Sequence, residues 1–510
     1  MYGVPLPQQK PNWTDGRNFR TIRRLSGSVT YQGRQVTTPD PFFDEMRKEE
    51  GHPRDPYFDY HHWIAGQDVR KLRKKLAEAE VYFRRTGITF NVYGSGQADE
   101  RLIPFDIVPR IIAEREWARL GRGIEQRVMA INAFIHDIYH RQEIIRAGRV
   151  PREIIENNDA FLPQMIGFSP PGGVYTHICG IDLVRTGDNQ FYVLEDNVRT
   201  PSGVSYMLEN RETMQHMFPE LFAKIKVRPV SDYPERLARS LSACAPSAAE
   251  GDALIAVLTP GVMNSAYFEH SFLADQMGAE LVESHDLRLV DGRIGMRTTR
   301  GYQPIDVLYR RVDDAYLDPL SFLPESALGV PGIMDVYRAG GITIANAPGT
   351  GIADDKAIYS YMPEIVEFYT GQKAILENVP TWRCAEPDAL AYVLDHLAEL
   401  VVKEVHGSGG YGMLVGPAAS KRELAKFAAK LRRRPGNYIA QPTLALSTVP
   451  VLTRSGLAPR HVDLRPYVLV APGRIDITPG GLTRVALKKG SLVVNSSQGG
   501  GTKDTWVLEN

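Results

Sequence analysis

The stretch GIDLVRTGDNQFYVLEDNVRTPSG, residues 180–203, contains two short apolar runs on either side of residues 186–189, Thr-Gly-Asp-Asn. Two such runs around a turn sequence predict a β-hairpin. If the loop has two or four residues, Asp182 lies opposite Val193 and is a diagonal neighbour of Glu195. We therefore expect the two carboxylates on one face of the ribbon.

Asn197 should share that face, because alternate side chains of a strand point the same way. Three oxygen-bearing side chains on an apolar ribbon need a partner. Mg²⁺ prefers carboxylate, amide and water oxygens and commonly shares its shell with nucleotide phosphates. We thus predict a magnesium site made by Asp182, Glu195 and Asn197. The alternative is that these residues cap a turn or pair with the nearby Arg185 and Arg199.

A glycine-rich segment, residues 406–412, follows the apolar stretch 400–405. It matches G-x-G-x-x-G, but the dinucleotide fold needs a helix after the glycines, and residues 413–415 predict a returning strand. The segment is better suited to cover phosphates with its backbone N–H groups while Lys403 reaches them from the strand. The alternative is an ordinary hairpin turn beside a surface lysine. The candidate contacts in this segment are Gly407, Ser408, Gly409 and Gly410.

Two further cations are poorly explained by their local sequence. Lys356 follows two aspartates near the start of a predicted helix, 354–369, where the helix dipole disfavours positive charge. A bound anion would explain it, and solvent exposure beside the aspartates is the alternative. Arg465 lies within 461–470, a predicted strand of alternating character. An arginine buried there needs a carboxylate or a phosphoryl group as its partner.

The remaining sequence predicts a mixed α+β / α/β protein of more than one lobe. Apolar residues at helical spacing extend over 67–85 and over 108–145. Our predicted divisions are an N-terminal arm at 1–60, a helical region with the metal-binding hairpin at 61–247, an α/β lobe of alternating strands and helices at 248–345, and a nucleotide-binding region with the glycine-rich segment at 346–510.

Composition excludes several classes of protein. The chain has 510 residues, and 60 Lys+Arg balance 60 Asp+Glu, so no global field attracts nucleic acid or anionic lipid. No segment approaches the roughly 20 apolar residues of a membrane span, and the N-terminus lacks a basic start followed by an apolar run. Three cysteines suit a reducing compartment. We expect a cytoplasmic protein that binds neither nucleic acid nor membrane.

The order of the motifs along the chain resembles the circularly permuted ATP-grasp family, and within it the glutathionylspermidine synthase-like proteins. That order is Asp182 with Glu195-x-Asn197, then Lys356, then Lys403 with the glycine-rich segment, then Gln441, and last the strand with Asp463-Leu-Arg465. The resemblance covers about residue 85 to 510, and residues 192–203 and 495–501 strengthen it. Ordinary ATP-grasp enzymes present their phosphate lysines before the metal carboxylates, whereas here the hairpin precedes both lysines. The roles that the resemblance implies are Mg²⁺ binding for Asp182, Glu195 and Asn197, phosphate contacts for Lys356 and Lys403, the adenine hinge for Gln441, and the transferring phosphoryl group for Arg465.

One position departs from the family pattern. Glutathionylspermidine synthases carry an arginine two residues before the metal aspartate, where this chain has Gly180. Arg199 or Arg465 is a candidate to supply that charge. The departure leaves specificity for glutathione and spermidine open, and without an N-terminal Cys/His pair only the synthetic half of such an enzyme is implied.

The family resemblance implies a carbon–nitrogen ligase that uses ATP and Mg²⁺. Its substrates would be a small-molecule or peptide carboxylate and an amine, joined through an acyl phosphate. The alternative is a nucleotide-binding protein with the ATP-grasp fold and no ligase turnover. A third hypothesis, an oxidoreductase that uses the glycines of 407–412, requires a helix directly after Gly412. Hydrolase motifs such as G-x-S-x-G and H-E-x-x-H are absent from the sequence.

Overall fold

The computed structural model describes residues 29–31, 34–36, 42–49, 51–94, 97–249, 251–406, 412–492, 494 and 500–509. Helices and strands are mixed throughout these residues, which confirms the predicted α+β / α/β class. Among them, no helix combines the length and apolar character that crossing a bilayer requires.

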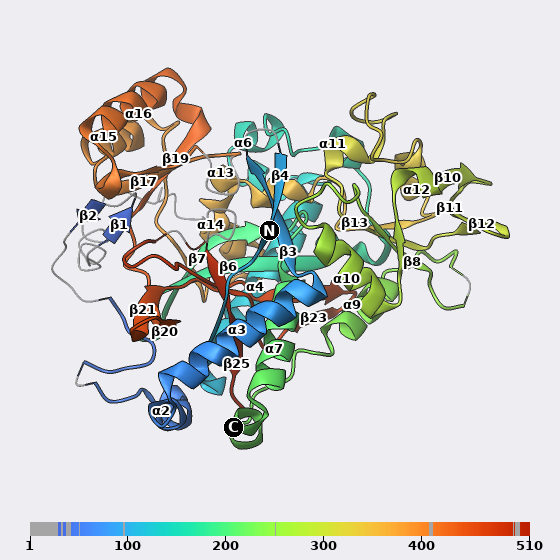
Figure 1. The fold of residues 1–510 in the computed structure, drawn as a ribbon. Coiled ribbons are helices and arrows are strands. Elements are labelled where there is room, and N and C mark those ends of the chain that lie inside the picture. The colour runs from blue at the N-terminus through green and yellow to red at the C-terminus, as the bar shows by residue number, and fades with distance from the viewer. Residues whose placement is uncertain are drawn as a thin grey trace.

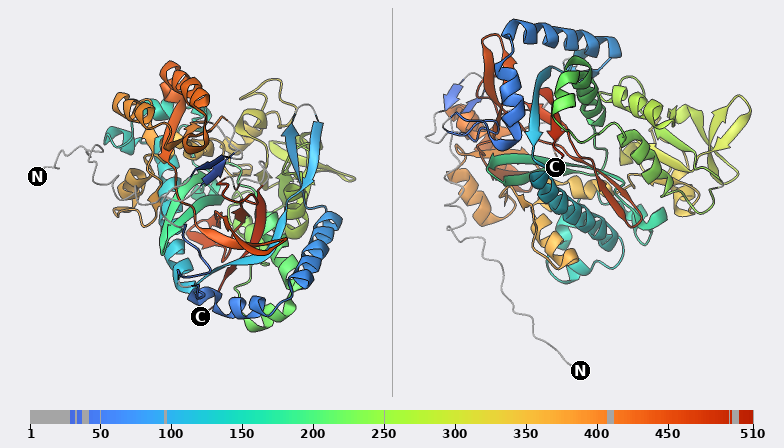
Figure 2. Two further views of the ribbon diagram at one scale, coloured as in Figure 1. Left: turned by 60° about the vertical axis from the view of Figure 1, so that its left-hand side comes forward. Right: turned by 90° about the horizontal axis from the view of Figure 1, so that it is seen from below.

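The predicted hairpin is present at the centre of the molecule (Figure 1). It consists of β6 (Ile178–Gly187) and β7 (Gln190–Asn197), inside a five-stranded sheet of order β15-β7-β6-β22-β23. The other strands are β15 (Glu377–Asn378), β22 (Tyr467–Ala471) and β23 (Arg474–Ile477). The long helix α4 (Glu114–Ile138) lies along this sheet, as the right-hand view of Figure 2 makes clear. A large apolar core joins the helix to the sheet.

The register of the hairpin differs from our prediction. Asp182 lies directly opposite Glu195, not opposite Val193. The turn is formed by residues 188–189, one position later than the predicted centre, and Asn189 adopts a left-handed φ of 53°, which asparagine tolerates. Two β-bulges, one on each strand, offset each other between the turn and Asp182. The prediction that both carboxylates share a face is nevertheless confirmed.

Three predicted elements have other bounds in the structure. The helix predicted over 108–145 starts at Glu114, because Phe105–Ile112 forms the fully buried strand β5. The helix predicted over 354–369 is divided into η5 (Thr350–Asp354), α13 (Lys356–Tyr359) and α14 (Met362–Thr370). The strand predicted over 461–470 is interrupted, since Pro466 has no N–H to donate. Arg465 forms an isolated bridge with Leu482 instead.

A four-stranded parallel sheet, β14-β13-β8-β9, occupies residues 255–345. Its strands are β8 (Ile255–Leu258), β9 (Glu280–Val282), β13 (Val307–Arg310) and β14 (Thr343–Ala345). The helices nearby are α9 (Tyr233–Ser242), α10 (Tyr267–Met277) and α12 (Ile333–Arg338). Strand, helix and strand alternate here as the sequence predicts. A small antiparallel sheet extends from this part, made of β10 (Leu287–Val290), β11 (Arg293–Thr298) and β12 (Gly301–Pro304).

A further sheet, β16-β19-β17-β18, forms a separate layer with its own apolar core (upper left of Figure 1). Its strands are β16 (Trp382–Arg383), β17 (Leu400–Glu404), β18 (Leu414–Val415) and β19 (Tyr438–Pro442). The helices α15 (Pro387–Asp395) and α16 (Lys421–Arg433) pack on it. The dinucleotide-binding hypothesis requires a helix directly after Gly412, but β18 follows this residue, so the structure contradicts that hypothesis.

The first and last parts of the chain meet in the three-stranded sheet β24-β25-β5. Its end strand β5 runs parallel to β25 (Gly501–Val507), which is also paired with β24 (Thr483–Val485). The remaining elements that bear on the site or its surroundings are α2 (Phe58–Ala65), α3 (Val69–Thr86), α7 (Val204–Met217), α8 (Pro219–Lys224), β20 (Thr448–Thr453) and β21 (Gly456–His461).

Candidate functional site

Strands β6 and β7 bring the acidic residues of the hairpin together. Asp182 has no exposed surface, whereas 33% of the Glu195 side chain is exposed. The Oε1 atom of Glu195 lies 3.8 Å from Nη2 of Arg465. Glu195 is therefore the carboxylate of this pair that a ligand can reach.

Asp182 is held by two guanidinium groups. Arg465 donates from Nε to Oδ1 of Asp182 and from Nη2 to Oδ2, the latter at 2.8 Å. Arg484 donates from Nη2 to the same Oδ2 at 2.6 Å. Burial opposes ionisation of Asp182, but the two positive charges outweigh it and hold its pKa below the usual range. The carboxylate is thus ionised and fixed at both oxygens.

Asp463 extends this cluster on the far side of Arg484. The Nε atom of Arg484 lies 3.0 Å from each oxygen of Asp463, which is fully buried. Burial raises the pKa of Asp463, and Arg484 opposes that rise. Two carboxylates and two guanidinium groups balance in charge, so the negative charge of Glu195 at the edge remains for another partner.

Lys403 supplies positive charge from the neighbouring sheet. Its Nζ donates to Oε1 of Gln441 at 2.8 Å, and Nε2 of Gln441 donates to Thr381 at 3.0 Å. Burial lowers the pKa of Lys403 to about 8, while the charge of Glu195 acts in the opposite direction. The charge of Lys356 also lowers the pKa of Lys403, and the charge of Asp182 also raises it. The field of the hairpin carboxylates and of the second lysine therefore reaches Lys403.

Lys356 begins α13, as its predicted place near a helix start requires. The preceding Asp355 caps the helix by accepting from the backbone N–H groups of residues 357 and 358 at 2.9 and 3.2 Å. The Nδ1 atom of His406 lies 3.0 Å from Oδ2 of Asp355, and this contact raises the pKa of His406. The end of β17 is thereby joined to the start of α13. The predicted phosphate contacts Gly407, Ser408, Gly409 and Gly410 lie outside the described residues.

Arg199 lies among a different set of partners. Its Nη1 is 3.5 Å from Asp313 and its Nε is 3.9 Å from Asp354. Asp354 accepts from the backbone N–H of Val198 at 2.6 Å. Burial raises the pKa of Asp354 to about 7, with smaller contributions from Asp196 and Glu195. Arg199 therefore faces the end of the parallel sheet, and of the two arginines predicted to replace the family arginine, Arg465 is the one that contacts Asp182.

Comparison with known proteins places this geometry in a family. Residues 109–486 match the family described as circularly permuted ATP-grasp type 2. The chain belongs to this circularly permuted ATP-grasp family. The resemblance inferred from the order of hairpin and lysines is thereby confirmed.

Relatives of the ATP-grasp chain extend over most of its length. An uncharacterized protein of Synechocystis is 52% identical over 475 residues, which is 93% of this chain and 98% of the relative. An uncharacterized protein of Mycobacterium tuberculosis is 50% identical over 511 residues, covering 100% of this chain and 90% of that protein. A Frankia alni protein named "Putative glutamate--cysteine ligase 2-3" is 42% identical over 471 residues. That match covers 91% of this chain but 54% of the Frankia protein.

A solved structure shares the fold. A glutathione synthetase-like effector from Globodera pallida, in its apo form, superposes with a TM-score of 0.55 at 11% sequence identity. The match covers 87% of this chain and 98% of the effector. At this identity the likeness concerns the fold alone.

ATP-grasp proteins generally bind ATP with Mg²⁺, and part of the predicted ligand set fits an oxygen-bound cation. Glu195 is accessible, and Nδ2 of Asn197 is buried without a hydrogen-bond partner. Turning that amide by 180° would place its oxygen in the same position. Both oxygens of Asp182 already accept from arginines. Of the three predicted ligands, Glu195 and Asn197 therefore remain available to a cation. In the described ranges, no three His, Cys, Asp or Glu side chains form a metal-binding group.

Sequence reasoning missed two residues of this cluster. Arg484 follows the short segment Gly480-Gly-Leu-Thr483, with no motif to distinguish it, and its proximity to Asp182 depends on pairing between segments 302 residues apart. Asp354 was visible only as an acidic neighbour of Lys356. A buried arginine with two buried acidic partners is recognisable only after the strands are placed.

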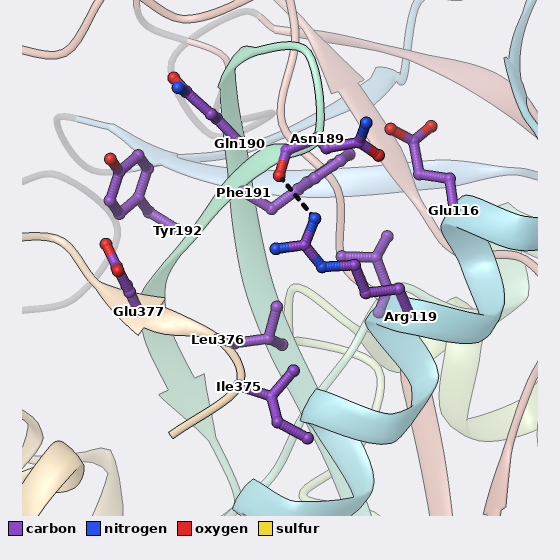
Figure 3. Close-up of a pocket in the computed structure, with 10 residues that line it drawn as sticks. Glu116, Arg119, Asn189, Gln190, Phe191, Tyr192, Ile375, Leu376 and Glu377 are labelled. Atoms are coloured by element: carbon purple, nitrogen blue, oxygen red, sulfur yellow. Dashed lines mark hydrogen bonds between the residues drawn. The ribbon is translucent and has the colours of Figure 1, made fainter. Parts of the chain in front are cut away.

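A cavity of about 240 Å³ lies at the other end of the hairpin (Figure 3). It is bounded by the turn at Asn189, by Arg119 of α4 and by Glu377 of β15. Arg119 donates to the backbone oxygen of Asn189 at 3.3 Å. None of the residues that line it belongs to the predicted ATP-grasp ligand set. The cavity is therefore distinct from the cluster around Asp182.

Proposed function

We propose that the protein is an ATP-dependent carboxylate–amine ligase that forms an amide bond through an acyl phosphate. Its chemistry would be similar to that of glutathionylspermidine synthase, and the identity of its acid and its amine is open. ATP and Mg²⁺ would be its cofactors. Membership of the circularly permuted ATP-grasp family supports the reaction class.

The observation that carries the proposal is the approach of opposite charges from separate elements. Lys403 comes from β17, Lys356 from α13, and Glu195 and Asp182 from the hairpin. His406, just after β17, lies 3.0 Å from Asp355 at the start of α13, and Arg465 lies 3.8 Å from Glu195. A set of cations and carboxylates at one place suits a nucleotide triphosphate with its divalent cation. The solved glutathione synthetase-like effector from Globodera pallida shares this fold.

Each residue would have a separate role in the reaction. Lys356 and Lys403 would bind phosphate oxygens, and Gln441, which already accepts from Lys403, would lie near the adenine hinge. Glu195 and Asn197 would hold the cation, with Asp182 able to reach it only by releasing an arginine contact. When bound, Mg²⁺ would offset charge on the β- and γ-phosphate oxygens. Arg465 would face the negative charge that grows on the transferring phosphoryl group.

The bond changes in the proposed reaction balance as follows. A carboxylate oxygen of the acid attacks the γ-phosphorus of ATP, and the bond to the β-phosphate oxygen breaks to release ADP. The amine nitrogen then attacks the acyl carbon, a C–N bond forms, phosphate leaves, and the nitrogen loses a proton. The protein contributes mainly position and charge to such transfers.

The substrates would be a small-molecule or peptide acid and an amine. Arg199 supports a place for the acid or for its remote carboxylate, because 40% of its side chain is exposed and its Nε atom is buried without a hydrogen-bond partner. Arg199 lies beside the carboxyl end of β13, where ligands of open α/β sheets commonly bind.

The proposal is tested by ADP release in the presence of Mg²⁺ and pairs of acids and amines, including peptides and polyamines. We expect ADP formation that requires both members of one pair, with amide product in equal amount. Nucleotide binding without ADP formation for any pair would instead support a binding protein of ATP-grasp fold that has no ligase turnover. Release of ADP at the same rate without an amine would contradict ligation.

A further inference from the structure

Arg465 does not depend on Asp182 alone for its position. Its backbone N–H donates to the oxygen of Leu482, and the N–H of Leu482 donates back, both at 2.9 Å. The N–H of Asp463 donates to the oxygen of Arg484 at 3.2 Å. These backbone bonds set segment 463–465 beside segment 482–484. Leu464 also bridges to Leu183 on β6, so three segments lie side by side.

The side chains across these segments form one buried network. Arg484 contacts Asp182 at 2.6 Å and Asp463 at 3.0 Å, and only 11% of its side chain is exposed. Asp182 and Asp463 have 0% and 1% of their side chains exposed. Such a network costs free energy of desolvation, and an apolar replacement is often no less stable. Its presence is better explained by the side-chain positions that it imposes than by a contribution to stability.

The geometry restricts the atoms that Arg465 can offer. Its Nε and Nη2 donate to Asp182, and its Nη1 donates to the backbone oxygen of Ser202 at 3.2 Å. The same Nη2 lies 3.8 Å from Glu195. The guanidinium plane therefore follows the orientation of the Asp182 carboxylate. Arg484 binds Oδ2 of that carboxylate and so prevents it from rotating.

We infer that Arg484, anchored by Asp463, is a positioning residue that fixes the Asp182 carboxylate and, through it, the guanidinium of Arg465. The inference rests on the proposed function, in which Arg465 faces the transferring phosphoryl group. Arg484 itself touches neither nucleotide nor cation in this account. Its loss should lower the rate of phosphoryl transfer more than it lowers nucleotide affinity.

The first test separates rate from affinity. In Arg484→Met we expect ADP formation to fall about 100-fold in kcat, with the Kd of an ATP analogue plus Mg²⁺ changed less than threefold. Arg484→Lys should recover part of the rate because it restores the charge. Arg211→Met is the control, since Arg211 is a buried arginine that pairs with Asp504 at 2.9 Å and donates to neither Asp182 nor Asp463. It should change the melting temperature without the selective loss in kcat.

The second test reports the position of Arg465 without any turnover. In protein labelled with ¹⁵N-arginine, the Nε–H signal of Arg465, identified by its absence in Arg465→Lys, should be sharp and slow to exchange. It should broaden in Arg484→Met and in Asp463→Asn, and remain in Arg211→Met. Near-ultraviolet circular dichroism checks that each variant is folded, and Arg484→Lys serves if the methionine variant is not.

An unchanged Arg465 signal together with an unchanged kcat in folded Arg484→Met would overturn the inference and leave the proposed ligase function intact. Equal losses in affinity and rate would also overturn it, because they would indicate a direct contact with nucleotide. Absence of ADP formation by the unmodified protein would overturn the proposed function, and the Nε–H signal would then still decide whether Arg484 positions Arg465.

Discussion

The side chain of Arg465 lies directly against Gly180. A Cβ atom added at Gly180 would stand 3.2 Å from Cδ and 3.4 Å from Cγ of Arg465. In the glutathionylspermidine synthases that this chain resembles, an arginine replaces this glycine. Here Arg465 and Arg484 both donate to Asp182, and the absence of a side chain at 180 leaves the space for Arg465. Gly180 and Arg465 are thus explained together.

Gly180→Ala should therefore disturb the site without unfolding the protein. The added methyl group would also meet Cβ of Pro201 at 3.3 Å, so neighbouring atoms must move by a few tenths of an ångström. Overpacking of this kind costs about 1–3 kcal/mol. We expect ADP formation to fall roughly tenfold, corresponding to about 1.4 kcal/mol, with nucleotide affinity nearly unchanged. Unaltered turnover would show that Arg465 does not need this space.

Lys403→Met should weaken nucleotide binding without destabilising the free protein. Loss of a charge-assisted contact of about 1.5–3 kcal/mol would raise the Kd of an ATP analogue ~10- to 100-fold. The melting temperature should not fall, because burial already disfavours the ammonium charge. Isothermal titration and thermal unfolding measure the two effects. Lys426→Met, at an exposed position of α16, is the control and should change neither.

Nucleotide affinity should decrease as pH rises through the pKa of Lys403. Burial lowers that pKa to about 8 from 10.5, so the free protein loses the positive charge above that pH. The free energy of unfolding should change in the opposite direction. Between pH 8 and 10.5 the unfolded chain binds the proton of Lys403 more strongly than the folded protein does, so the contribution of Lys403 to stability rises with pH. The Kd of an ATP analogue between pH 7 and 9.5 tests the first effect. Lys403→Arg should show little change over that range, and a parallel decrease in both proteins would exclude Lys403 as the titrating group.

Asp354→Asn should stabilise the protein most above neutral pH. Burial raises the pKa of Asp354 to about 7, so the folded state keeps a proton that the unfolded state has already lost. The resulting cost grows as pH rises from 3.8 to about 7 and then stays constant. The amide removes this cost and can still accept from Val198. Melting temperatures of variant and parent should diverge between pH 5 and 8, and a constant difference would contradict the raised pKa.

Local patterns were sufficient for the hairpin and for the class of the fold. Alternating apolar residues around a polar turn predict β6 and β7, and the helical spacing over 67–85 corresponds to α3 (Val69–Thr86). The register was misplaced because it depends on which two residues form the turn, and Asn189 in a left-handed conformation shifted it by one position. The helix predicted from residue 108 failed because the buried strand β5 has an apolar pattern that a helix can also satisfy.

The candidate site was only partly accessible to such reasoning. Asp182, Glu195 and Lys403 were identified from residue type and local context, and Arg465 from the need of a buried arginine for an anion. Its actual partner in the structure is a carboxylate, Asp182. Arg484 could not be predicted, because its role depends on long-range pairing between β24 and the segment before β22. The periodicity of apolar residues indicates which face of a helix or strand is buried, but it does not indicate which distant segments pack against one another.

The most direct test of the account is the binding of a non-hydrolysable ATP analogue, by titration calorimetry, with and without Mg²⁺, to the parent protein and to Glu195→Gln. We predict binding to the parent that strengthens with Mg²⁺, and loss of that dependence in Glu195→Gln with a nearly unchanged melting temperature. Glu325→Gln, at an exposed position, should behave as the parent. Equal dependence on Mg²⁺ in Glu195→Gln and the parent, or no nucleotide binding by the parent, would contradict the central claim that the hairpin carboxylates and the lysines form one ATP site.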